Sequence, residues 1–178
     1  SSLEKAEDEV RELLRDVERV LKEVRDRIEE LNRKVNEVLR RVIEESERLL
    51  REVLERVRGR REVTELLKEV KKRNDKVRKD IRKESEEDKK KVEETVAEIK
   101  KELDDLRRDV RRVAEENGPS EKVRRLVDKV RETVTDIVRR VTRLLEESEE
   151  SVRRLIEKVK KLNEESRRIV EKIEKDAR

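Results

Sequence analysis

Residues 10–35 read VRELLRDVERVLKEVRDRIEELNRKV, and the aliphatic side chains of this stretch decide the fold. They recur at alternating spacings of four and three residues, as Val10, Leu14, Val17, Leu21, Val24, Ile28, Leu31 and Val35. This spacing places them on one stripe of an α-helix, and a stripe sustained over many turns is typical of coiled-coil packing. We therefore predict a long amphipathic helix that packs against other helices.

Two further stretches carry the same pattern, one over 92–113 and one over 123–141. The only glycines and the only proline of the chain, Gly59, Gly118 and Pro119, separate the three stretches. Asn117-Gly118-Pro119-Ser120 predicts a helix end capped by Gly118 and a new helix capped by Ser120. Gly59 is a weaker signal, because one glycine costs a helix only about 1 kcal/mol. We expect helices at about 2–58, 61–117 and 120–177 in a single elongated domain.

Together these patterns predict an all-α, antiparallel, up-down-up three-helix coiled-coil bundle. An extra four-residue step, as from Val35 to Leu39, raises the mean period of the stripe toward 3.6. Such a period predicts long, nearly straight helices with little supercoil. A free-standing charged middle helix is the alternative, since residues 71–91 carry few apolar side chains. The regular stripe over 92–113 favours the bundle.

Charged residues make up 57% of the 178 residues, and the chain contains no aromatic residue, His, Cys or Met. The 53 bases and 49 acids nearly balance, which leaves a net charge of +4. Imidazole chemistry, thiolate chemistry and metal sites built from His or Cys are therefore excluded. Both glycines are isolated, so no glycine-rich phosphate loop exists. We predict no enzyme, no catalytic, metal or cofactor-binding residue, no cofactor and no small-molecule substrate.

The sequence also bears on where the protein resides. The longest uncharged apolar run is two residues, which is far too short to span a membrane. No signal-peptide pattern opens the chain, which starts at Ser1 rather than Met. We expect a soluble, trimmed expression product, made in a bacterial cytoplasm if it is synthetic, whose cellular location is otherwise unknown.

Scarce uncharged polar residues lie on or beside the apolar stripes. In helical hairpins about Gly59 and Gly118, the numbers of facing residues add up to about 119 and about 236. By this rule the polar residues form three layers and one pair: Ser46, Asn74 and Asn163; Asn36, Ser85 and Ser151; Asn32, Asp88 and Ser148; Thr95 and Thr142.

We interpret these layers as hydrogen-bonded positions that set the register of the helices. In particular, we expect Asn74 and Asn163 to be buried and bonded within one layer. A ligand or ion site is the alternative interpretation of the layers. It is less favoured, because amides and hydroxyls without His or paired carboxylates make poor metal sites.

Partners are less clearly indicated. Helices 1 and 3 carry apolar residues beside their main stripes, which leaves open a monomer or a symmetric homo-oligomer through these two helices. The stretch from Lys68 to Lys83 holds nine bases against three acids. Without aromatic residues or a recognition motif, it predicts at most weak, nonspecific binding of polyanions, and no specific binding of nucleic acid.

Taken together, the chain resembles computationally designed helical bundles with buried hydrogen-bond networks. The resemblance rests on three nearly equal helices, a Val, Leu and Ile core, the 117–120 connector and a Glu, Lys and Arg surface. It implies no natural activity, a role in folding or self-assembly, and very high thermal stability. The alternative is a natural binding module similar to a spectrin-type three-helix repeat. Such repeats usually keep aromatic core residues and varied loops, which this chain lacks.

Overall fold

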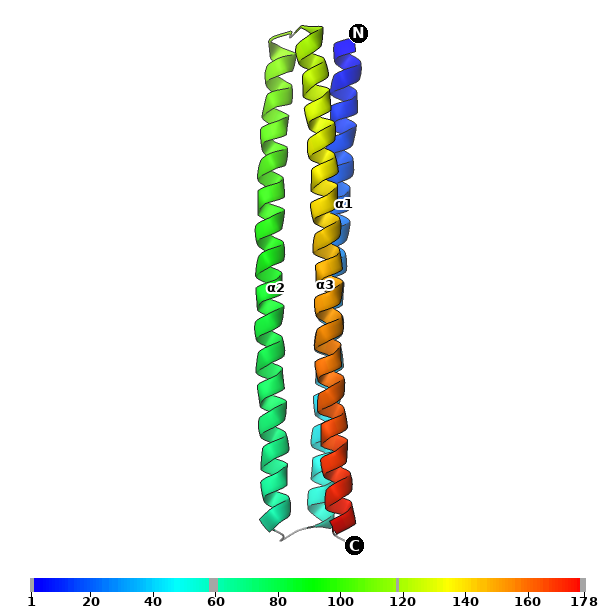
Figure 1. Ribbon diagram of the computed structural model, residues 1–178, viewed down its shortest axis with the longest axis vertical. Coiled ribbons are helices and arrows are strands. Elements are labelled where there is room, and N and C mark those ends of the chain that lie inside the picture. Colours follow the sequence, from blue (N-terminus) through cyan, green and yellow to red (C-terminus); the bar gives the residue numbers. More distant parts are fainter. Residues whose placement is uncertain (1, 58–60, 118, 177–178) are drawn as a thin grey trace. The chain divides into compact units, whose positions relative to one another are not determined.

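The computed structural model describes residues 2–57, 61–117 and 119–176. The Gly59 connector and the predicted Gly118 cap lie outside the described residues. Three helices account for nearly all of the rest: α1 (Ser2–Arg56), α2 (Arg61–Glu115) and α3 (Ser120–Asp176) (Figure 1). The chain is therefore an all-α three-helix bundle, as predicted. α1 and α2 each end two residues before their predicted ends, and residue 177, the predicted end of α3, lies outside the described residues.

The junction between α2 and α3 differs in detail from the prediction. Asn117 takes up the left-handed backbone conformation, with φ of 49°, which asparagine tolerates better than most residues. The first backbone bond of α3 runs from the Val123 amide to the Pro119 carbonyl, 3.2 Å away. The capping position therefore falls on Pro119, one residue before the predicted Ser120.

The packed residues divide into two units, and each unit contains part of all three helices. Unit 1 comprises Ser1–Glu29 and Asp88–Ser148, and unit 2 comprises Glu30–Glu87 and Glu149–Arg178. Each unit has its own core and its own ion pairs.

Ion pairs give the direction of the helices within unit 2. Arg73 of α2 pairs with Glu165 of α3, and Glu84, further along α2, pairs with Lys158, which lies earlier in α3. The α2 and α3 segments are therefore antiparallel. Between α1 and α3 the order is the same in both helices, since Glu45 pairs with Arg167 and Arg56 with Glu174. These α1 and α3 segments are parallel.

The core of each unit is aliphatic. In unit 1, one cluster joins Val10, Leu14, Val17, Leu21, Val24 and Ile28 to Val92, Val96, Ile99, Leu103 and Leu106, and to Val127, Val130, Ile137, Val141 and Leu144. In unit 2, a cluster comprises Leu50, Val53, Val57, Val63, Val70, Val170 and Ile173. The residues of the unit 1 cluster follow the predicted stripes, because a helix turns by 100° per residue and spacings of three and four return to one face.

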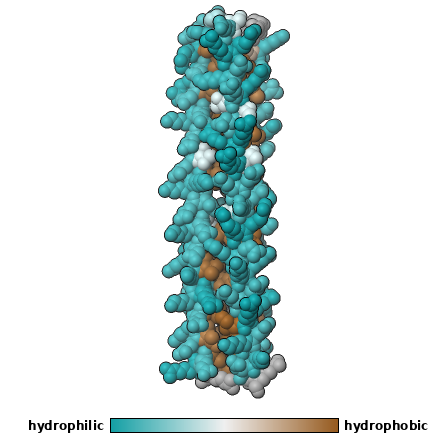
Figure 2. Space-filling view, viewed as in Figure 1, coloured by the Kyte–Doolittle hydropathy of each residue, from teal (hydrophilic) through white to brown (hydrophobic). Residues whose placement is uncertain are grey.

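Hydrophilic side chains cover most of the face shown in Figure 2, and apolar atoms show in the gaps between them. Among the described residues, the large apolar side chains that are most exposed are Leu54, at 42%, and Val138, at 37%. No helix in the described ranges is long and apolar enough to cross a membrane.

Candidate functional site

A polar cluster interrupts the aliphatic core of unit 2. It joins one residue from each helix: Ser46 of α1, Asn74 of α2 and Ser166 of α3, all buried. The Asn74 Nδ2 donates to Ser46 Oγ over 3.2 Å, and Ser46 Oγ donates to Ser166 Oγ over 3.3 Å. Ser46 is thus the central member of a chain of two hydrogen bonds across three helices.

The local sequence explains why these side chains point inward. Each occupies a place where the apolar stripe would carry Val, Leu or Ile: Ser46 follows Ile43 by three residues, and Asn74 follows Val70 by four. Ser166 likewise follows Leu162 by four. Helical spacing therefore buries three polar groups that water would otherwise solvate. A buried polar group left unpaired costs about 1–3 kcal/mol. The two hydrogen bonds therefore offset part of the cost of removing these three side chains from water.

One polar atom of the cluster has no partner. The Asn74 Oδ1 is buried and accepts no hydrogen bond in the described part of the chain. Its Nδ2 donates one hydrogen bond to Ser46, so the side chain is paired at the nitrogen end alone. A carbonyl oxygen with no donor at 2% side-chain exposure retains its full capacity to accept a hydrogen bond.

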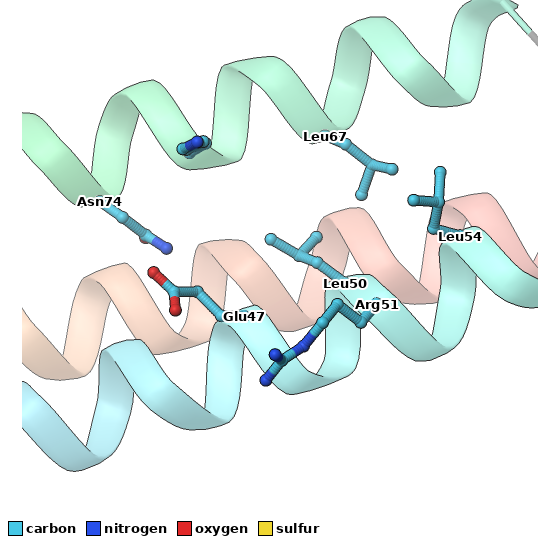
Figure 3. A pocket seen from close by; sticks show the side chains of 7 residues that line it. Glu47, Leu50, Arg51, Leu54, Leu67 and Asn74 are labelled. Carbon is cyan, nitrogen blue, oxygen red and sulfur yellow. The ribbon is translucent and has the colours of Figure 1, made fainter.

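A groove lies beside this cluster, between α1 and α2 of unit 2. Its volume is about 430 Å³, and its lining comprises Glu47, Leu50, Arg51 and Leu54 of α1 with Leu67, Lys71 and Asn74 of α2. In Figure 3, the three leucines project into the space between the two ribbons. At the other end of the groove, the side chains of Glu47 and Asn74 point toward one another. The groove thus has an apolar part and a polar end.

The predicted layer was wrong in its third member, the residue from α3. Prediction placed Asn163 beside Asn74, but the structure places Ser166 there, and Asn163 is half-buried. The stagger of α2 and α3 explains the difference. The residue numbers of their ion pairs, such as Arg73 with Glu165 and Glu84 with Lys158, add up to 238 or 242 rather than to about 236. The facing α3 residue therefore lies further along the chain.

Two other predicted positions are wrong because they lie one residue past the core stripe. Asn36 follows buried Val35, and Thr142 follows buried Val141; both Asn36 and Thr142 are exposed. A step of one residue turns the side chain by about 100°, away from the core. Thr95, the predicted partner of Thr142, is half-buried, and its Oγ1 donates to the Lys91 carbonyl of its own helix over 2.9 Å.

The remaining polar positions vary in burial. Ser148 and Ser151 are buried, whereas Asn32, Ser85 and Asp88 are half-buried. Within the described ranges, no group of three or more Asp or Glu side chains could hold a metal ion.

The basic stretch 68–83 is partly neutralised. Arg73 lies 3.1 Å from Glu165 of α3, and Arg78 lies 3.9 Å from Asp75 of its own helix.

In unit 1, a hydrogen bond and the charge of Glu9 raise the pKa of Arg131. That guanidinium therefore stays charged over the whole practical pH range.

Comparison of the chain with protein-family models, curated proteins and solved structures finds no match.

Proposed function

We propose that this chain is a designed structural protein whose function is to fold as a helical bundle of defined register. The observation that carries the proposal is the hydrogen-bonded cluster of Ser46, Asn74 and Ser166 in an otherwise aliphatic surrounding. A core of Val, Leu and Ile alone would be more stable, because buried polar groups bring a desolvation cost. Their presence is consistent with specificity rather than with maximal stability.

The physical basis of register control is the periodicity of the helix. An aliphatic stripe repeats every three or four residues, so a helix that slips by one turn still presents Val, Leu or Ile to its neighbours. A slip by one turn does not preserve the polar cluster. A slip of α2 places the Asn74 amide against aliphatic side chains and separates its Nδ2 from Ser46 Oγ. Each unpaired group then costs about 1–3 kcal/mol.

Ion pairs on either side of the cluster support the same register. Arg73 pairs with Glu165 over 3.1 Å, and Glu45 and Arg167 approach to 3.8 Å. Exposed pairs of this kind are worth about 0–1 kcal/mol each. They add to the preference that the buried cluster sets, but a single pair does not replace it.

The design origin is supported by composition: a core built from Val, Leu and Ile, helices of 55, 55 and 57 residues, and a surface of Glu, Lys and Arg. Such a palette follows the rules of idealised bundles. Two assembly states are compatible with it, a monomer and a symmetric oligomer through α1 and α3. In both states the fold itself is the function.

The test replaces the cluster by apolar residues in the triple variant Ser46→Ala, Asn74→Leu and Ser166→Ala. Nitroxide labels attached at Lys72→Cys and Arg168→Cys, both exposed and in unit 2, report the stagger of α2 and α3 by electron–electron distance measurements. The unaltered core should give one narrow distance distribution. The triple variant should be more stable but give a broad or two-peaked distribution.

A matched control keeps the cluster and changes an exposed polar residue of the same unit, Asn36→Leu. It should leave the distance distribution unchanged. If the triple variant keeps the same narrow distribution as the unaltered chain, the cluster does not set the register and the proposal fails.

A further inference from the structure

We propose that Asn117 is a site of spontaneous covalent modification, at which attack by the backbone nitrogen of Gly118 converts the side-chain amide to a carboxylate. Asn117 is the one asparagine of the chain that precedes a glycine. The other four, each followed by a charged residue, are Asn32, Asn36, Asn74 and Asn163. The inference concerns the junction between α2 and α3 and does not depend on register control.

The reaction uses only atoms of the chain and water. The Gly118 nitrogen forms a bond to Asn117 Cγ, the bond from Cγ to Nδ2 breaks, and ammonia leaves with the proton of the attacking nitrogen. Water then opens the cyclic imide at either carbonyl, which gives an aspartate or, where the main chain runs through Cγ, an isoaspartate. Glycine favours the first step, because it has no Cβ to crowd the attacking nitrogen.

The structure places Asn117 just outside the helix. α2 ends at Glu115, and the side chain of Asn117 is exposed. The Glu116 amide still donates to a carbonyl four residues back, over 3.0 Å, whereas the Asn117 amide donates only three residues back, to Ala114, over 3.3 Å. The φ of Asn117, 49°, lies in the left-handed region. The helical hydrogen-bond pattern therefore ends before the reacting residue.

The helical backbone protects the other four asparagines, all of which lie inside helices. In the interior of a helix, the nitrogen that follows an asparagine donates to a carbonyl four residues back and is held in place. Asn36 separates this effect from burial, since it is exposed like Asn117 but lies within α1. Attack at Asn36 requires the helix to open locally, and an opening that costs about 1.4 kcal/mol slows the reaction tenfold.

The product alters the end of α2. A carboxylate at position 117 adds negative charge next to Glu115 and Glu116, at the helix end where the dipole disfavours it. An isoaspartate also lengthens the main chain by one carbon. Modification therefore destabilises the last turn of α2.

The experiment incubates the full chain in mildly alkaline buffer and follows the peptide 113–122, which cleavage after Arg112 and Lys122 releases, by mass spectrometry. This peptide should gain the mass that separates a carboxylate from an amide at least about tenfold faster than peptides with the other asparagines. Its products should include isoaspartate as well as aspartate. Aspartate alone overturns the proposal, because direct hydrolysis by water gives no isoaspartate.

Two variants separate the effect of the neighbouring residue from that of the backbone. Gly118→Ala places a Cβ beside the attacking nitrogen and should slow the reaction at Asn117 at least about tenfold. The matched variant Glu37→Gly gives Asn36 a following glycine inside α1. Asn36 should still react at least about tenfold more slowly than Asn117, because the helix holds the nitrogen. An unchanged rate in the first variant, or equal rates in the second, overturns the proposal.

A comparison with the denatured chain does not require either variant to fold. Guanidinium removes the helices, so the ratio of the native to the denatured rate isolates the effect of the backbone at each asparagine. The ratio should be close to one at Asn117 and below about one tenth at Asn36. A ratio at Asn117 as low as that at Asn36 overturns the proposal.

Discussion

Asn74 donates to Ser46 through Nδ2 over 3.2 Å, while its Oδ1, equally buried, accepts from no group in the described part of the chain. The two ends of one amide therefore have opposite energetic effects. The donated bond offsets the burial of Nδ2, whereas Oδ1 carries the cost of a lost interaction with water. This asymmetry predicts that substitutions at Asn74 and at Ser46 change stability in opposite directions.

We expect Asn74→Leu to raise the free energy of unfolding by about 1–2 kcal/mol. Leucine removes the unpaired Oδ1 and adds apolar contact in a position of the core stripe. Ser46 retains Ser166 as a hydrogen-bond partner, so it is not left unpaired. Guanidinium denaturation followed by circular dichroism measures the change, and a drop in the midpoint would contradict the prediction.

Ser46→Ala should instead lower the free energy of unfolding, by about 2 kcal/mol. The substitution removes the acceptor of Asn74 Nδ2, which leaves both ends of a buried amide unpaired. The same Ser46→Ala change made in the Asn74→Leu background should cost less, because the amide is gone and only the Ser166 hydroxyl loses its hydrogen bond. This double-mutant cycle isolates the coupling of the two side chains, and equal costs in both backgrounds would show that the bond contributes nothing.

The sequence was sufficient to predict the faces of the helices. The stripe from Val10 to Ile28 is buried as expected, because a helical period determines which side chains share one face. It was also sufficient to identify Ser46 and Asn74 as neighbours across α1 and α2. These two positions lie on the stripes and close to one hairpin connection.

The stagger of α2 and α3 could not be predicted in the same way. Moving one helix along another by a turn keeps the aliphatic stripes in contact, so the stripes alone do not determine which residues of α2 and α3 face each other. The signal that was available is that Ser166 follows Leu162 by four residues and lies on the stripe, whereas Asn163 follows it by one. Placement relative to the stripe would likewise have excluded Asn36 and Thr142.

The ion pair between Arg73 and Glu165 joins α2 to α3 close to the polar cluster, and both side chains are about half exposed. We expect Glu165→Gln to lower the free energy of unfolding by less than about 1 kcal/mol, because water screens exposed charges. The loss should shrink in concentrated NaCl, which shortens the range of the interaction. Denaturation at low and high salt measures both effects, and a large loss that salt does not alter would contradict the prediction.

Ile137 and Val138 are adjacent in α3 but differ in burial, since Ile137 is 0% exposed and Val138 is 37% exposed. Ile137→Ala should lower the free energy of unfolding by about 2–5 kcal/mol, because it removes buried methyl groups and leaves a cavity in unit 1. Val138→Ala should cost less than about 1 kcal/mol, because water already reaches that side chain in an isolated chain. Chemical denaturation of the two variants at low protein concentration compares their free energies of unfolding directly.

A self-associated chain that covers Val138 would instead make its substitution costly, and that cost would fall on dilution. The pair therefore tests the direction of the core stripe and, through Val138, whether this part of α3 faces water.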